Sequence, residues 1–356
     1  QPRRTPVNPL STSGGTGRHW RSASLAACLP KEPPTMSASP SSRLHLQVTD
    51  FRAVARDVVL VELAAVDGTE LPAFTPGAHL ELHLGNGLIR HYSLLNDCRE
   101  RQRYQLAIGL GDDSRGGARF IHRQLRTGDR LHAAAPRNHF MLREDAARYC
   151  FVAGGIGITP ILSMVRWCQA QGKDWRLLYA VRERQRAAFL AELMTLGGER
   201  TRLHCSDEGD PLDSTALIAG LGADEELYCC GPDGLMQAIR DAGSGCAERL
   251  HFERFDAPVA PASSSGGTDA FRLELRRSAL SLRVESHQSI LEVLEEQGLE
   301  PPYACRAGIC RTCETRVCAG EPEHFDHVLS DTERASGETL LICVSRCRGN
   351  YLELDL

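Results

Sequence analysis

Four cysteines in the last quarter of the chain constrain its fold more than any other feature. Cys305, Cys310 and Cys313 have the spacing C-x4-C-x2-C, and Cys343 follows inside an apolar run. The first three have the spacing of plant-type [2Fe–2S] ligation, in which soft thiolates hold each iron and small loop residues let the backbone approach the cluster. Zinc sites usually show two cysteine pairs or a pair of histidines, and neither follows here. The pattern therefore predicts a [2Fe–2S] cluster held by these four cysteines.

Two further cysteines, Cys318 and Cys347, lie close enough in sequence to compete as ligands. We prefer Cys343 because residues 340–344 predict an apolar strand around it, whereas Cys347 lies between two arginines. Both extra cysteines are expected to be free thiols. The 14 cysteines in 356 residues are too dilute for a disulfide scaffold, and no signal peptide is evident, so a cytoplasmic protein is expected.

Charge and hydropathy exclude two classes of partner. The formal net charge of −5 has the wrong sign for a protein that mainly grips nucleic acid. The longest largely apolar stretch, residues 150–165, contains three glycines and a proline and is too short to span a bilayer. We expect neither a nucleic-acid nor a membrane partner.

The pattern of apolar residues changes several times along the chain. Apolar residues alternate with period 2 from Leu44 to about Pro136, which predicts a small antiparallel β-barrel. From about 148 to 256 strand and helix patterns alternate, which predicts an α/β domain with a parallel sheet. The expected organisation is a disordered leader 1–40, a barrel domain 41–142, an α/β domain 143–256, a flexible linker 257–269 and a cluster domain 270–356.

The expected leader begins with Gln1 and contains Met36 just before the regular patterning starts. We expect Met36 to be the natural start. A targeting peptide is the alternative, since the stretch is basic, but it lacks an amphipathic helical period.

A short motif in the barrel domain, Arg90-His91-Tyr92-Ser93, resembles the R-x-Y-[ST] flavin motif of the ferredoxin–NADP reductase superfamily, and its residue types suit a flavin. In this motif, an arginine can clamp a phosphate, a tyrosine can stack on the isoalloxazine ring and a hydroxyl can hydrogen-bond flavin N5. A glycine loop at 114–119 precedes a helical pattern, where backbone donors suit a phosphate. The predicted contacts in this loop are Gly116, Gly117 and Arg119.

Two glycine motifs follow predicted strands of the α/β domain. Gly154-Gly155-Ile156-Gly157-Ile158-Thr159-Pro160 opens a helix, where glycines let a pyrophosphate approach the backbone. Cys230-Gly231-Pro232 follows a later strand. Near the end of the second strand, Arg182 and Arg184 could accept a 2′-phosphate, whereas Glu183 would favour a ribose diol.

These motifs together resemble one family over nearly the whole of residues 44–356. The run 302–313 resembles the cluster loop of plant-type ferredoxins, and 323–330 with 343–346 resemble the C-terminal domain of phthalate dioxygenase reductase and vanillate demethylase reductase. The flavin motif and both glycine motifs are similar to those of the ferredoxin–NADP reductase superfamily. Ala118 departs from that pattern, since related reductases often carry Ser or Thr there.

The resemblance implies three folded parts and three cofactors. It implies a flavin barrel, a nicotinamide-binding α/β domain and a β-grasp ferredoxin domain, with FMN, NADH and one [2Fe–2S] cluster. It also implies that Cys230 lies near the nicotinamide and that Phe255 covers the flavin ring. The predicted catalytic residues are Ser93 and Cys230; the predicted cofactor-binding residues are Arg90, His91, Tyr92, Ser93, Gly116, Gly117, Arg119, Gly154, Gly155, Gly157, Thr159, Pro160, Cys230, Gly231, Pro232 and Phe255.

The expected function is electron transfer rather than oxygenation. Nicotinamide delivers two electrons together and a [2Fe–2S] centre takes one, so a flavin is needed between them. The sequence carries no Rieske ligand set and no haem-thiolate module, so oxygen activation is assigned to a partner. The expectation is a monomeric NADH-dependent oxidoreductase serving a Rieske-type terminal oxygenase. Alternatives are a P450 or quaternary-amine monooxygenase as acceptor, or, more remotely, a non-enzymatic iron–sulfur protein.

Overall fold

The structure is a computed structural model that describes residues 43–356 apart from 112–113, 115, 210–211 and 256–268. The expected leader 1–40 and nearly all of the expected linker 257–269 therefore lie outside the described residues. No helix in the described ranges is long and apolar enough to cross a membrane.

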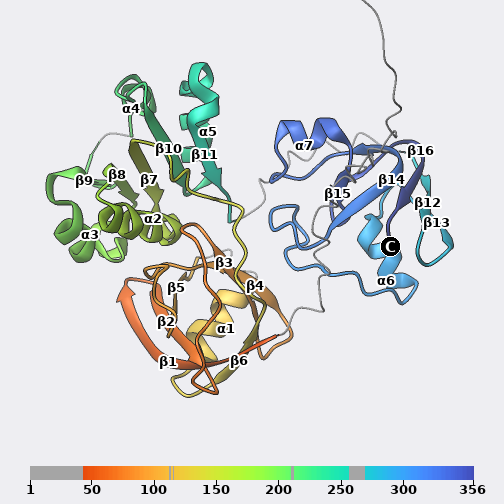
Figure 1. Ribbon diagram of the computed structural model, residues 1–356, viewed down its shortest axis with the longest axis horizontal. Helices are drawn as coiled ribbons and strands as arrows, with labels where there is room; N and C mark the ends of the chain where they lie inside the picture. The colour runs from red at the N-terminus through yellow and green to blue at the C-terminus, as the bar shows by residue number, and fades with distance from the viewer. Residues whose placement is uncertain (1–42, 112–113, 115, 210–211, 256–268) are drawn as a thin grey trace, which may run out of the picture. The chain divides into compact units, whose positions relative to one another are not determined.

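The first part of the described chain is an antiparallel barrel (Figure 1). The sheet order is β4-β3-β6-β1-β2-β5, and a bridge from Leu94 to Leu106 joins the end of β4 to β5. Alternate apolar residues such as Leu46 and Val48 point into one core, as the period-2 pattern predicts. The strands are β1 (Leu44–Ala55), β2 (Val58–Ala65), β3 (His79–His83), β4 (Ile89–Ser93), β5 (Tyr104–Gly109) and β6 (Arg130–Ala133), with helix α1 (Gly117–Gln124) between β5 and β6.

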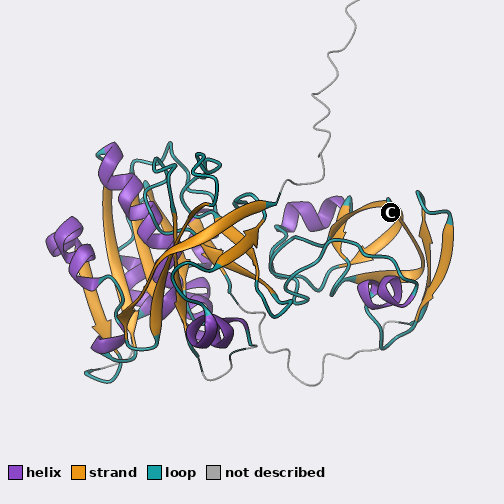
Figure 2. Cartoon of the chain, turned by 90° about the horizontal axis from the view of Figure 1, so that it is seen from below, coloured by secondary structure: helices purple, strands orange, loops and turns teal. Residues whose placement is uncertain are grey.

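The second part is a parallel sheet covered by helices on both faces (Figures 1 and 2). Along β7, Phe151 packs in the core that contains Leu162 of α2, while Val152 packs in the core that contains Ile239 of α5. Both faces are buried, which explains the continuous apolar run in the sequence. The elements are β7 (Arg148–Gly154), α2 (Ile158–Gln171), β8 (Asp174–Val181), α3 (Leu190–Gly197), β9 (Thr201–Cys205), α4 (Ser214–Ala219), β10 (Glu225–Cys230), α5 (Asp233–Ala242) and β11 (Leu250–Glu253).

The strand order of this sheet determines where a nucleotide can bind. The order is β11-β10-β7-β8-β9 with all pairs parallel, so the chain changes direction between β7 and β10. In open α/β sheets, ligands bind at the carboxyl ends of the strands at such a switch point. Both glycine motifs lie there, one after β7 and one after β10.

The third part is a mixed sheet that holds a helix against one face. The order is β13-β12-β16-β14-β15, with β12 and β16 parallel and the other pairs antiparallel. Ile290 and Leu294 of α6 are fully buried in the core of this part, and Ser289 begins the helix with a capping box. The elements are β12 (Phe271–Leu275), β13 (Leu280–Val284), α6 (Ile290–Glu296), β14 (Glu314–Glu323), α7 (Asp331–Ser336), β15 (Thr339–Leu341) and β16 (Arg346–Leu354).

These sheets confirm the predicted barrel, parallel sheet and C-terminal cluster fold. One local expectation is wrong. Cys343 does not lie inside a strand, because β15 ends at Leu341 and the residues 342–344 form a turn. The turn lets the thiol face the cluster loop while the flanking apolar residues Leu341 and Ile342 stay buried.

Candidate functional site

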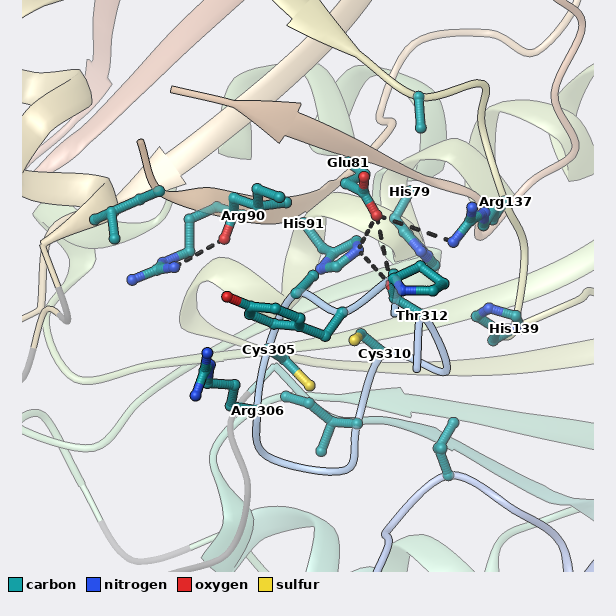
Figure 3. A pocket seen from close by; sticks show the side chains of 18 of the residues that line it. His79, Glu81, Arg90, His91, Arg137, His139, Cys305, Arg306, Cys310 and Thr312 are labelled. Carbon is teal, nitrogen blue, oxygen red and sulfur yellow. Dashed lines mark hydrogen bonds and ion pairs between the residues drawn. The ribbon is translucent and has the colours of Figure 1, made fainter. Parts of the chain in front are cut away.

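A single cavity of about 1050 Å³ contains residues from the flavin motif and from the cluster loop (Figure 3). Arg90 and Ser93 line it from the barrel, Phe255 lines it beyond β11, and Cys305 and Cys310 line it from the cluster loop. Residues more than 200 positions apart in sequence therefore face one cavity. His91, also predicted, lines the same cavity.

Ser93 supplies the orphaned polar atom that a flavin would satisfy. Its side chain is buried, and its Oγ has no hydrogen-bond partner among the described residues. A buried hydroxyl without a partner is costly unless a ligand pairs with it. The position of this hydroxyl on the cavity wall fits the expected hydrogen bond to flavin N5.

Arg90 packs directly against the predicted phosphate loop. A Cβ added to Gly117 would lie 2.6 Å from Arg90 Cγ, so only glycine permits this approach. The Arg90 guanidinium donates a hydrogen bond from Nη1 to the carbonyl oxygen of Ile89 at 2.8 Å. Gly116 has φ of 89° and begins α1, a conformation that favours glycine.

Four predicted flavin residues, Tyr92, Gly116, Gly117 and Arg119, do not line the cavity. Tyr92 packs against the barrel core, and burial raises the pKa of its hydroxyl to about 12. Arg119 is exposed, and its backbone N–H donates to Ser114 Oγ at 3.3 Å. The alternation of β4 explains the position of Tyr92, because Ser93 and Tyr92 face opposite sides of the sheet.

The two glycine motifs of the nucleotide site pack against each other. A Cβ at Gly157 would lie 2.1 Å from the carbonyl oxygen of Cys230, and a Cβ at Gly154 would lie 2.5 Å from Pro232 Cδ. Gly231 approaches the Gly154 backbone equally closely. The glycines are thus required for the close contact between the loops after β7 and β10.

Thr159 and Pro160 lie in the first turn of α2, and Gly155 lies in the short turn that precedes the helix. Thr159 is buried and donates from its hydroxyl to the carbonyl oxygen of Ile156 at 3.0 Å. Pro160 lies in the first turn, where its missing N–H leaves no helical bond unmade. Gly155 has φ of 55°.

Cys230 and Glu253 form a buried titratable pair at the ends of β10 and β11. They are register partners, and burial raises the pKa of the Cys230 thiol well above its ordinary value. The thiol is therefore protonated at neutral pH. Burial also raises the pKa of Glu253 to about 8, and its Oε2 has no partner among the described residues. The predictions did not include Glu253, which also lines the cavity.

The cluster loop has an unusual backbone that suits wrapping around an inorganic centre. Arg306, Gly308 and Arg311 have φ of 51°, 66° and 57°, and two of these are not glycine. Non-glycine residues at positive φ cost energy and persist only where surrounding structure holds them. The backbone N–H of Ala307 donates to Cys305 Sγ at 3.3 Å.

The four predicted ligands have thiols that contact one another. Cys305 Sγ lies in hydrogen-bonding contact with Cys310 and Cys343, which lowers the pKa of Cys305, and Cys313 contacts Cys343 in the same way. Cys347 takes no part in this group, because its thiol donates to the carbonyl oxygen of Tyr351 at 3.1 Å. This donor set fits a thiolate-held cluster.

A further polar group on the cavity wall was missed by the sequence analysis. His79, Glu81 and His83 lie on β3 and face the cavity, with Arg137 and His139 beside them. Burial would raise the pKa of Glu81, but hydrogen bonds and charge from His91, with the charge of Arg137, hold it at about 2. Burial lowers the pKa of His79 to about 3. The alternation His-Leu-Glu-Leu-His was a signal for this face.

Comparison with known proteins supports this division of the chain. Residues 273–348 match the family described as 2Fe-2S iron-sulfur cluster binding domain, and residues 151–241 match the oxidoreductase NAD-binding domain. The predicted cluster and nicotinamide-binding parts are thereby confirmed.

Several reductases are similar over almost their whole length. A putative toluene-4-sulfonate monooxygenase system reductase subunit of Comamonas testosteroni is 41% identical over 89% of this chain and 100% of its own. The phthalate dioxygenase reductase of Burkholderia cepacia is 37% identical over 88% of this chain and 97% of its own. The chain belongs to the phthalate dioxygenase reductase family. The relatives are named as components of oxygenase systems. This chain is therefore an oxidoreductase that transfers electrons to an oxygenase partner.

Solved structures match the fold. A phthalate dioxygenase reductase structure covers 88% of this chain and 98% of its own, with 37% identity and a TM-score of 0.65. An intact type IV self-sufficient cytochrome P450 monooxygenase gives a TM-score of 0.82 at 36% identity. That match covers 88% of this chain but only 41% of the P450 chain.

Proposed function

We propose that this chain is the NADH-dependent reductase component of a two-component Rieske-type oxygenase, an aromatic dioxygenase or O-demethylase. Electrons would pass from NADH to FMN, from FMN to the [2Fe–2S] cluster and from there to the oxygenase. The observation that carries the proposal is the single cavity shared by Arg90, Ser93, Cys305 and Cys310. A flavin bound there would lie within reach of two ligands of the cluster.

The chain's own residues divide the work of this reaction. When bound, the flavin accepts two electrons from the nicotinamide and releases them singly. Ser93 Oγ would hold flavin N5, and the protonated Cys230 thiol would face the nicotinamide without carrying charge. Arg90, with the backbone of Gly116 and Gly117, would bind the flavin phosphate.

The choice of NADH over NADPH rests on the end of β8. Glu183 forms an ion pair with Arg56 Nη1 at 2.7 Å, and Arg184 forms an ion pair with Glu208 at 3.5 Å. Two of the three candidate readers of the ribose are thus already paired. We propose NADH because a carboxylate remains at the position that a ribose diol would meet.

The nature of the acceptor is the finer part of the proposal. We propose a Rieske non-haem iron oxygenase as partner, and a monomeric reductase in the cytoplasm. Relatives named for toluene-4-sulfonate, phenoxybenzoate and phthalate systems support this acceptor. A P450 or quaternary-amine monooxygenase as acceptor is not favoured by these relatives.

Purification in the loaded form tests the proposal. The protein is expected to carry FMN and a [2Fe–2S] cluster, and to reduce cytochrome c with NADH faster than with NADPH. Extracted flavin identifies FMN against FAD by chromatography. A colourless protein, or one that leaves cytochrome c oxidised in the presence of NADH, would contradict the enzyme assignment. Electron delivery to a purified Rieske oxygenase, but not to a P450, would support the proposed acceptor.

A further inference from the structure

Glu81 is a buried carboxylate on β3 of the barrel, and the packing of β3 does not explain why a charged residue is buried there. Its side chain is 10% exposed, although the preceding and following residues on β3 already fill the barrel core. Oε1 lies 3.1 Å from His83 Nε2, Oε2 lies 3.4 Å from His91 Nε2, and Arg137 Nη1 is 3.9 Å away. A buried charge of this kind is normally retained only where it is paired and does specific work.

The cluster loop provides one more partner for this carboxylate. Thr312 lies between the ligands Cys310 and Cys313, and its Oγ1 is 3.5 Å from Glu81 Oε2 and 3.4 Å from His91 Nε2 (Figure 3). Glu81 and His91 are register partners on β3 and β4, so their side chains share one face of the sheet. The three polar atoms form a compact triangle between the barrel and the cluster loop.

We propose that the Glu81–His91 pair is the docking point for the cluster loop and positions the cluster against the flavin through the Thr312 hydroxyl. This inference rests on the proposed function, and it gives Glu81, His91 and Thr312 a shared positioning role that neither the flavin motif nor the cluster motif assigned to them. Glu81, His91 and Thr312 are positioning residues. In this arrangement Thr312 donates its proton to Glu81 and accepts one from the imidazole of His91.

Positioning matters here because the step is an electron transfer across a gap between two centres. When both groups are bound, the flavin would supply one electron and the cluster would accept it. No bond forms or breaks, and the Thr312, Glu81 and His91 side chains are neither oxidised nor reduced. These side chains contribute by stabilising the docked position of the cluster loop. Losing their hydrogen bonds would lower the ratio of docked to undocked loop by about two- to tenfold.

The charges around Glu81 favour this docked state. His83, His91 and Arg137 surround it on the barrel side, and Arg311 of the cluster loop acts on the nearby His139. Arg311 is itself held by Glu314 and Glu333, so the loop presents no unpaired cation to the barrel at this point. The Thr312 hydroxyl is therefore the group of the loop that approaches the Glu81 carboxylate.

Three variants test the hydroxyl and the carboxylate in the loaded full-length protein. Thr312→Val removes the hydroxyl at nearly constant volume, Thr312→Ser keeps it, and Glu81→Gln keeps the shape but removes the charge. Thr339→Val is the matched control, because the Thr339 hydroxyl donates to Glu314 within the same part of the chain. Glu62→Gln is the control for Glu81, since it accepts hydrogen bonds on β2 instead.

Two measurements report on docking independently of turnover. Hydrogen–deuterium exchange of the peptides that contain 79–83 and 310–314 reports the contact itself. Stopped-flow spectroscopy separates flavin reduction by NADH from cluster reduction by flavin. We expect Thr312→Val and Glu81→Gln to speed exchange in both peptides and to slow cluster reduction by flavin about two- to tenfold. Thr312→Ser should restore both readouts, and the two controls should match the parent.

The remaining outcomes overturn the inference. If Thr312→Val matches the parent in exchange and in cluster reduction, the contact is incidental. If exchange rises while cluster reduction is unchanged, docking does not position the cluster. If Thr312→Ser is as slow as Thr312→Val, the hydroxyl is not responsible. Failure of the proposed function is distinct, since the parent protein would then show no flavin reduction by NADH.

Discussion

Cys305 and Cys310 are the two predicted ligands that line the cavity shared with Arg90 and Ser93. Their neighbours in the loop adopt a left-handed backbone, and the thiol of Cys305 contacts those of Cys310 and Cys343. In the proposed reaction these thiols would hold the cluster that receives the electrons, whereas hydride transfer would depend on other residues of the barrel and the parallel sheet.

Cys305→Ser is expected to abolish the cluster without abolishing hydride transfer. The hard hydroxyl is a poor ligand for iron in a thiolate set. Cluster absorbance and NADH-driven cytochrome c reduction should be lost, while bleaching of the flavin by NADH should persist. Cys347→Ser is the matched control, since that thiol bonds to Tyr351 and should be dispensable for the cluster. Loss of flavin bleaching in Cys305→Ser would contradict the separation of the two steps.

Burial of Glu253 predicts how the stability of the fold depends on pH. Its pKa of about 8 in the folded chain lies above the ordinary 4.5, so the folded state prefers the neutral carboxyl. The stability that this preference supplies is complete below about pH 4.5 and is lost as the pH rises toward 8. Glu253→Gln removes the titration. The melting temperature of the variant should rise relative to the parent between pH 5 and 8, by the equivalent of about 1.4 kcal/mol per pH unit at most.

Differential scanning calorimetry at several pH values measures this difference. A parent-minus-variant difference that stays constant from pH 5 to 8 would contradict the raised pKa. Glu248→Gln serves as control, because Glu248 is exposed and forms only a long contact to Arg249 at 3.9 Å.

At the scale of elements, α7 links a helix cap to the cluster loop. Ser330 begins the helix with a capping box in which Glu333 bonds back to the Ser330 backbone at 2.7 Å. The same Glu333 accepts a hydrogen bond from Arg311 Nη2 at 2.7 Å. One carboxylate thus holds both the start of α7 and a residue of the loop at positive φ.

Ser330→Ala is expected to lower stability by about 1 kcal/mol, as loss of an N-cap typically does. It should also speed loss of cluster absorbance on heating, because Glu333 is then less well held against Arg311. Ser289→Ala breaks the equivalent capping box of α6, whose Glu292 does not contact Arg311. Both variants should melt earlier, but only Ser330→Ala should lose its cluster faster. Equal bleaching rates in the two would contradict the link.

At the scale of the whole described chain, ion pairs join the barrel to the parallel sheet. Arg56 pairs with Glu183 at 2.7 Å and Asp57 pairs with Arg186 at 2.9 Å, across the turn between β1 and β2. The backbone N–H of Arg56 also donates to Gln185 at 2.9 Å. These contacts reach the segment that the sequence predicted to distinguish NADH from NADPH.

Arg56→Ala is expected to raise the KM for NADPH more than the KM for NADH. Without its partner, the Glu183 carboxylate repels a 2′-phosphate more strongly and is free to accept the ribose diol. Stability should change by less than about 1 kcal/mol, because the pair is partly exposed. Arg52→Ala is the control, since Arg52 pairs with Asp50 on β1 and not with Glu183. An unchanged ratio of the two KM values would contradict this role.

Much of the fold and part of the site could be predicted from local patterns. The cysteine spacing, the glycines before α2 and the alternation of apolar residues in the strands are local patterns of a few residues. They can therefore be read from the order of residues without knowledge of the tertiary structure. The prediction that Cys343 lies in a strand was wrong because apolar residues beside a turn and inside a strand look alike in sequence. Glu253 was missed because burial, rather than any motif, gives it a raised pKa.

The sequence by itself determined which residues could bind iron and nucleotide, because those chemistries depend on residue type and spacing. Only the tertiary structure decided which of them face one cavity. Tyr92 turned to the core and Ser93 to the cavity through strand alternation, and Glu81 met His91 through the register of β3 and β4. Thr312 reaches that pair from more than 200 residues away. Such a contact depends on how the folded parts pack, which residue order near either site does not specify.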